Sequence, residues 1–268
     1  SIVDFKWADM SNQIDNCTVT VEDIDVAQII WWKDVADLKG KTTRKKPTPV
    51  EGNALPVPKA ILNLHKYVTM SLDIFFVCAV PFFLTLSRRI DFVAATHLAN
   101  RKLETIYSAF KEVYAFYLKR GFKITTVYAD GEFEPLKKLL DADPKAPTLN
   151  LTSKGEHVGD IERRIRMLKE RMRALRAGLP FRRIPVILMI HLVLYCCRQS
   201  TYFPTKGGIS KNISPRMIML GEKLDYKKHL SLQFGEYCQV HEQDTPRNDT
   251  NKARTHGAIC MGPSGNKQ

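Results

Sequence analysis

The stretch that decides the fold is Tyr67-Val-Thr-Met-Ser-Leu-Asp-Ile-Phe-Phe-Val77, which is rich in β-branched and aromatic residues. Two similar runs follow at once, Pro81 to Leu86 and Ile90 to Thr96. Cys78 to Val80 separates the first two runs, and Arg88-Arg89 separates the last two. Three closely spaced strands without an intervening helix predict an antiparallel meander.

Helices and strands alternate after the meander. Asn100 to Arg120 carries apolar side chains at helical spacing, and Gly121 is suited to end that helix. A long helix is expected to begin near Ser153, because Ser153 and Glu156 have capping-box spacing. The remaining expected elements are a strand Phe122–Ala129, a short helix Glu134–Leu140, a strand Pro147–Leu151 and a buried helix ending near Cys197. The predicted fold is α/β, a mixed five-stranded sheet with flanking helices.

Two less regular segments flank this core, so the chain is divided into residues 1–65, 66–205 and 206–268. The first is expected to be an irregular N-terminal linker or arm with one short helix around Val21 to Leu38. The basic, turn-forming segment Lys39 to Pro47 fits either a solvated linker or a DNA-contacting arm. The last segment is loop-like, with strands of a small β module expected at Phe234–Val240 and Ala258–Met261.

The chain is strongly basic, with a net charge of +13 over 268 residues. Such an excess favours polyanions, because each phosphate contact releases condensed counterions. Nucleic acid is the favoured partner, anionic lipid competes with it, and a protein that is merely basic is the plainest alternative.

Membrane insertion and secretion are not expected. The longest apolar run, Ile184 to Cys197, is shorter than the roughly 20 residues that span a bilayer. The six cysteines lack C-x-x-C spacing and no secretory signal is visible, so reduced, mostly structural thiols of an intracellular protein are expected.

Three carboxylates stand out by position. Asp73 interrupts an apolar strand, where an ionised side chain is costly unless it is paired or metal-bound. Asp130 ends another strand, and Glu162 lies in the first turns of the long helix. If the first and fourth strands are neighbours, the three converge and could hold two Mg²⁺ ions. Taken singly, each also fits a structural role: an edge-strand residue, a turn residue and a solvated helix face.

The third ligand is open among several neighbouring acids. Glu156 has a capping role and Asp160 favours the positive end of the helix, so Glu162 is the first choice. Glu132 and Glu134 are also close enough in sequence to serve.

A basic run follows Glu162 on the same helix. Arg163, Arg166, Lys169 and Arg173 are the candidate nucleic-acid-binding residues, and Arg164, Arg171 and Arg176 complete the expected positive outer face. A charge run is often only a solvated helix face. Contact with the DNA backbone is favoured here because the run directly follows the proposed ligand.

The remaining motifs add little. The sequence shows no H-x-E-x-H or Ser-His-Asp spacing and no Gly-rich phosphate loop. His157 is expected to cap or pack, and Tyr195, Tyr202 and Phe203 are expected to belong to the core and not to stack on bases.

Three segments resemble the integrase of copia-type retrotransposon polyproteins, in the retroviral integrase superfamily. They are Thr69 to Arg88, Tyr128-Ala-Asp-Gly-Glu-Phe133 and Glu156-His-Val-Gly-Asp-Ile-Glu-Arg-Arg-Ile-Arg166. The resemblance covers about residues 66–200. It implies an RNase H-like fold and a catalytic, metal-binding triad at Asp73, Asp130 and Glu162.

The resemblance also implies an activity and partners. The activity is Mg²⁺- or Mn²⁺-dependent 3′-end processing and strand transfer with two ions, acting on the double-stranded DNA of element ends and target. A homo-oligomer and a nuclear location are expected. Two different functions stay open: a non-catalytic DNA-binding scaffold from a decayed or domesticated element, and a hydrolytic RNase H-like nuclease.

Overall fold

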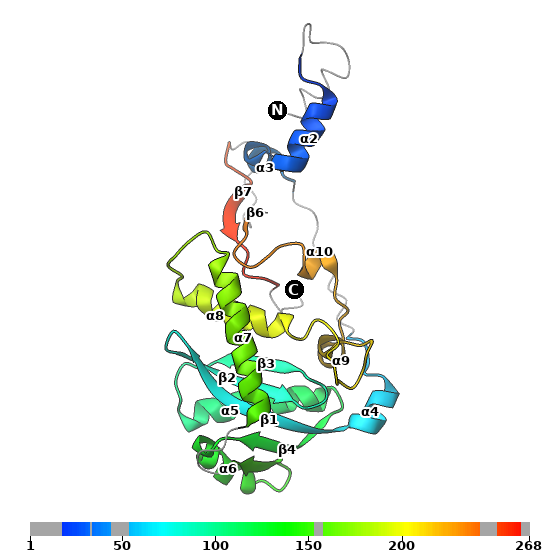
Figure 1. The fold of residues 1–268 in the computed structure, drawn as a ribbon, viewed down its shortest axis with the longest axis vertical. Coiled ribbons are helices and arrows are strands. Elements are labelled where there is room, and N and C mark those ends of the chain that lie inside the picture. Colours follow the sequence, from blue (N-terminus) through cyan, green and yellow to red (C-terminus); the bar gives the residue numbers. More distant parts are fainter. Residues whose placement is uncertain (1–17, 33, 44–53, 153–157, 242–250, 264–268) are drawn as a thin grey trace. The chain divides into compact units, whose positions relative to one another are not determined.

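The computed structural model describes residues 18–32, 34–43, 54–152, 158–241 and 251–263 (Figure 1). The chain divides into two compact units. One comprises Ser1–Val50 with Gly235–Cys260, and the other Glu51–Phe234 with Met261–Gln268. The division into 1–65, 66–205 and 206–268 stays a prediction.

The larger unit is built on a five-stranded sheet in the order β3-β2-β1-β4-β5. The strands are β1 (Tyr67–Val77), β2 (Val80–Ser87), β3 (Val93–His97), β4 (Lys123–Ala129) and β5 (Thr148–Leu151). β2 runs antiparallel to both β1 and β3, whereas β1, β4 and β5 run parallel to one another. The predicted mixed α/β sheet is confirmed, and its order and directions are those of an RNase H-like fold.

Each face of the sheet is covered by its own hydrophobic core. One core joins alternate β1 residues such as Leu72 to α5 (Leu103–Lys119) and α6 (Glu134–Asp141). The other joins Phe75 of β1 to α7 (Gly159–Ala177) and α8 (Val186–Gln199). α7 runs across this second face (Figure 1). Because side chains alternate along a strand, Ser71, Asp73 and Phe75 share the face that α7 covers.

Two tight turns shape the meander. β1 and β2 are joined by the two-residue turn Cys78–Ala79, in which both residues have positive φ, as this kind of hairpin requires. Arg89 and Asp91 also have positive φ in the turn between β2 and β3. After α5, Gly121 takes the left-handed conformation, with φ of 84°, as expected for the residue that ends that helix.

Residues 206–234 were predicted to be loop-like, and the structure corrects this. α9 (Pro215–Leu220) buries Ile218 and Met219 in the first core, and α10 (Tyr226–His229) follows. The Arg120 guanidinium donates to the carbonyl oxygens of Ile218 and Leu55, each at 2.8 Å. Arg120 directly follows α5, so its side chain links α9 and the segment around Leu55 to that helix. Both belong to the sheet unit, as does α4 (Lys59–His65).

The smaller unit is more regular than the predicted arm. The single helix expected at Val21–Leu38 is two helices, α2 (Val21–Trp31) and α3 (Val35–Lys41), because Trp32 has a φ of 63°. α3 takes in the start of the basic segment Lys39 to Pro47, which was predicted to be either a linker or a DNA-contacting arm. β6 (Tyr237–His241) and β7 (Thr255–Ile259) form an antiparallel pair, which confirms the two C-terminal strands, with ends shifted by a few residues.

Several smaller predictions can be compared with the structure. Tyr195 and Tyr202 are buried as expected, whereas Phe203 is 63% exposed and does not belong to the core. Cys196 and Cys197 are buried, but Cys78 is exposed. Ser153, Glu156 and His157 lie outside the described residues. Within the described part of the chain, no helix combines the length and the apolar character that crossing a bilayer requires.

Candidate active site

The register of two parallel strands places Asp73 beside Asp130. The last pair of the β1–β4 ladder is Ser71 with Tyr128. Two residues further along each strand come Asp73 and Asp130, and the backbone at Asp130 is still extended. Because parallel strands advance together, the two carboxylates lie level on neighbouring strands, with the Thr152 hydroxyl donating to Asp130 Oδ1 at 3.4 Å.

Glu162 reaches the same place from α7. The helix buries Ile161, Ile165, Leu168 and Met172 against the sheet. Glu162 follows Ile161, so its side chain lies at the flank of the buried stripe and not opposite it. Asp73 and Glu162 line one pocket of about 400 Å³. The predicted convergence of β1 and α7 residues is therefore present at this pocket.

The surroundings of Asp73 disfavour its charge. Burial raises its pKa, and the negative charges of Asp130, Glu132 and Glu162 add to that effect. The Ile74 amide, which donates to Asp73 Oδ1 at 2.7 Å, works in the opposite direction and is outweighed. The result is a pKa of about 6, against an ordinary value of 3.8. The charges of acids from three separate segments of the chain therefore act on Asp73.

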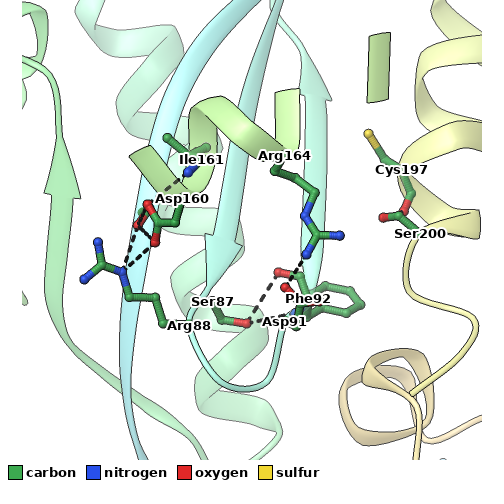
Figure 2. Close-up of polar contacts among 10 residues, drawn as sticks. Ser87, Arg88, Asp91, Phe92, Asp160, Ile161, Arg164, Cys197 and Ser200 are labelled. Carbon is green, nitrogen blue, oxygen red and sulfur yellow. Dashed lines mark hydrogen bonds and ion pairs between the residues drawn. The ribbon is translucent and has the colours of Figure 1, made fainter. Parts of the chain in front are cut away.

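Two ion pairs fix the first turns of α7 to the sheet unit. Figure 2 shows Asp160 turned toward Arg88, whose Nε donates to it at 2.6 Å, and Arg164 turned toward Asp91. Asp160 also accepts from the Ser71 hydroxyl at 2.9 Å. Ser71 is two residues from Asp73 on the same strand. These contacts therefore hold the first turn of α7 next to Asp73.

The structure places most of the acids that could replace Glu162 as third ligand. Asp160 and Glu162 lie about 100° to either side of Ile161, and Asp160 is occupied by Arg88 and Ser71. Glu132 forms an ion pair with Arg101 at 2.6 Å, although its charge still acts on Asp73. Glu134 forms an exposed pair with Lys138 of its own helix. Glu156 lies outside the described residues.

The basic residues of α7 divide into two groups. Arg166, Lys169 and Arg173 line the same pocket as Asp73 and Glu162. Arg163 is exposed but does not line that pocket. Arg164 was predicted to belong to the positive outer face; instead its side chain is mostly buried and pairs with Asp91. Sequence reasoning missed this because the partner lies in the turn between β2 and β3.

Phe76 also lines the pocket of Asp73 and Glu162, and sequence reasoning gave it no role. It is 42% exposed at the end of β1, and the Arg101 guanidinium lies 5.4 Å from its ring centroid. Because side chains alternate along β1, the Phe76 ring lies on the face opposite to Asp73 and Phe75, where Arg101 contacts it.

The donor chemistry of the pocket suits a hard divalent cation, which prefers carboxylate oxygens. The carboxylates are further apart, however, than the ligands of one shared ion would be. Among the residues that the structure describes, no three carboxylate, histidine or cysteine side chains stand closely enough together to hold a metal ion as they are placed. Asp73 and Glu162 line one pocket, and the charge of Asp130 acts on Asp73 from the neighbouring strand. The three acids would have to approach one another to share an ion.

Comparison with known proteins gives a fold likeness only. No family model matches the chain, and no curated protein matches it. Among solved structures, the chain is similar to the catalytic core domain of BIV integrase, with 15% sequence identity and a TM-score of 0.36. The match covers 57% of this chain and 93% of that one. A function for this chain must therefore be inferred from its own acids and cations.

Proposed function

We propose that this chain is a metal-dependent polynucleotidyl transferase that processes and joins DNA ends, as the integrase of a retrotransposon does. One observation carries the proposal. Asp73 of β1 and Glu162 of α7 line a pocket whose other charged side chains are Arg166, Lys169 and Arg173, and the charge of Asp130 at the end of β4 acts on Asp73. Clustered acids beside a row of cations suit a phosphodiester that must be held next to divalent ions.

Each group has a distinct role in this proposal. Asp73, Asp130 and Glu162 would hold the ions, Mg²⁺ or Mn²⁺. Two such ions, when bound, supply an activated nucleophile and stabilise the leaving oxygen. The three cations of α7 would hold the backbone phosphates, which positions DNA without reading its sequence. Arg88 and Arg164 would keep α7 in place and touch no substrate.

The raised pKa of Asp73 makes the proposed activity depend on pH. With a pKa of about 6, Asp73 is largely protonated in mildly acidic solution and ionised at neutral pH. Only the ionised form is a good ligand for a hard cation, because proton and metal compete for the same oxygen. We therefore expect activity to rise as the pH increases through 6.

The partners follow from the reaction. Joining DNA requires double-stranded DNA as element end and as target, and holding two ends together requires more than one copy of the chain. A homo-oligomer inside the cell, acting in the nucleus, is part of the proposal.

The test is a DNA cleavage and joining assay on the full chain with Mg²⁺ or Mn²⁺, comparing the parent with Asp130→Asn. The substitution removes a charged ligand with little change in shape, so we expect a loss of at least about 1000-fold in rate with folding and DNA binding retained. A variant that nicks or joins DNA at the parental rate would contradict the role given to Asp130. Products that are cut but never joined would favour a hydrolytic nuclease.

A second function is favoured by the spacing of the acids. Because no three ligand side chains among the described residues can hold an ion as placed, a DNA-binding scaffold without catalysis is the competing function. It predicts salt-sensitive DNA binding with no turnover in either metal, and unchanged behaviour of Asp130→Asn.

A further inference from the structure

The ends of β1 and β4 lie beyond the ladder that pairs the two strands. The register of β1 with β4 ends at Ser71 and Tyr128. Asp73 and Asp130 come two residues later, so the ladder by itself does not fix the distance between these two acids. Because the acids would have to approach one another to share an ion, a contact that joins the two strand ends would control how closely they can do so.

The side chain of Arg101 makes such a contact. Its Nη2 donates to Glu132 Oε2 at 2.6 Å, and Glu132 lies in the short turn η1 (Gly131–Phe133) that directly follows Asp130. The same guanidinium lies 5.4 Å from the ring centroid of Phe76, near the end of β1. One cationic group, supplied by the loop between β3 and α5, thus contacts both strand ends.

The loop that carries Arg101 is fixed on both sides. Leu98 is buried, and its amide donates to the carbonyl oxygen of Pro81 on β2 at 3.1 Å. On the other side, the Asn100 side chain accepts from the Lys102 amide at 2.9 Å, at the start of α5. The fold itself therefore places Arg101 at this edge of the sheet.

The η1 turn is anchored by its last residue. Phe133 is buried, and its ring packs against Phe83 with the centroids 6.5 Å apart. Its amide donates to the Asp130 carbonyl oxygen at 3.1 Å. Glu132 lies inside this turn, so a contact at its side chain acts on the backbone at Asp130.

We infer that Arg101 is a positioning residue of the candidate active site: it holds the end of β1 next to the turn after β4, and so sets how far Asp73 lies from Asp130. The inference rests on the proposed function for the task of these acids. The Arg101 and Glu132 side chains are 52% and 41% exposed. An exposed ion pair contributes little alone, as does an exposed cation–π contact, but here both act on the same separation.

The first experiment follows the turn itself and needs neither metal nor DNA. Amide hydrogen exchange of the full chain is followed by NMR in EDTA, with the Phe133 amide as reporter. Arg101→Ala should speed its exchange about tenfold, the factor that losing one exposed ion pair and one cation–π contact can produce together. Arg101→Lys keeps a cation near Glu132 and should restore most of the protection. Lys102→Ala is the matched control, because Lys102 is exposed and forms no ion pair with a described residue.

The second experiment measures turnover in DNA joining with Mn²⁺. Arg101→Ala and Glu132→Ala should each lower kcat about tenfold with KM for DNA unchanged. The double variant should lose no more than either single one, because both break the same link. If Arg101 contacted a DNA phosphate instead, Arg101→Ala would raise KM and Glu132→Ala would not lower kcat, and the inference would be overturned. A far larger loss in Glu132→Ala than in Arg101→Ala would also overturn it, since Glu132 would then be a metal ligand.

The exchange experiment decides the link independently of catalysis. The inference is overturned if the Phe133 amide exchanges at the parental rate in Arg101→Ala, or if Lys102→Ala speeds it equally. A parent without turnover in either metal, in which Arg101→Ala still speeds the exchange, would count against the proposed function alone.

Discussion

Asp160 and Asp73 both lie where α7 meets β1, and their carboxylates have opposite environments. Asp160 is partly buried, which opposes its charge, but hydrogen bonds from Arg88 and Ser71 outweigh burial and hold its pKa below 3.8. Asp73 is partly buried among other acids, and its pKa rises to about 6. One flank of α7 thus uses a carboxylate to hold the helix, whereas the other gathers negative charge at a pocket.

The opposite pKa shifts distinguish a structural carboxylate, Asp160, from a candidate functional one, Asp73. A carboxylate with a lowered pKa stabilises the fold when ionised, and one with a raised pKa destabilises it. A carboxylate with a raised pKa that lines a pocket is a candidate functional residue, and Asp73 is one. Each of the following experiments changes one flank and leaves the other intact.

Removing the structural carboxylate should have the largest effect on stability. Asp160→Ala deletes the partner of Arg88 and Ser71, so we expect a loss of about 2 kcal/mol in the free energy of unfolding at pH 7. Urea denaturation measures it. Glu162→Gln, on the opposite flank, is the control and should change stability by less than about 0.5 kcal/mol. Equal losses in the two variants would abolish the distinction between the flanks.

Neutralising Asp73 should act in the opposite direction. Its pKa is raised in the folded chain to about 6, so the folded state binds more protons than the unfolded state between pH 3.8 and 6, and stability falls as the pH rises through that window. Asp73→Asn removes this penalty. After allowance for screening by water, we expect a gain of about 1 kcal/mol at pH 7 and none at pH 4. Thermal melts at the two pH values measure it; a loss at pH 7 would show that Asp73 has a stabilising partner.

The smallest effect concerns the cations. Arg173→Ala should lower the slope of log affinity against log salt concentration for duplex DNA by about one, the change expected for one lost phosphate contact. Arg171→Ala, on the same helix but outside the pocket that Asp73 and Glu162 line, should leave the slope unchanged. A change of the same size in both variants would mean that the helix attracts DNA by general charge and has no defined phosphate path.

The sheet was predictable because its signals are local. Runs of β-branched and aromatic residues fix β1 and β2, and an acid within such a run marks Asp73 as unusual. The adjacency of β1 and β4 was only a condition of the predicted convergence; the structure shows it, and it brings Asp73 level with Asp130. A six-residue helix such as α9 carries too little periodicity to be found in this way.

The sequence ranked Glu162 above Asp160 as third ligand but left Asp160 open as an alternative. Both acids flank Ile161, and both lie in the first turn of α7. What separates them is the position of Ser71 and Arg88, which only the folded sheet brings to one flank. The same applies to Arg164, whose partner Asp91 is supplied by a distant turn.

Titration of the full chain with Mn²⁺ at pH 7, followed by calorimetry, tests most directly whether the acids around Asp73 form a site for divalent ions. We expect saturable binding by the parent, which weakens sharply at pH 5 and is lost in Asp73→Asn, while Asp160→Asn retains it. Equal binding by the parent and Asp73→Asn, or no binding by the parent at pH 7, would show that these acids do not form a metal site.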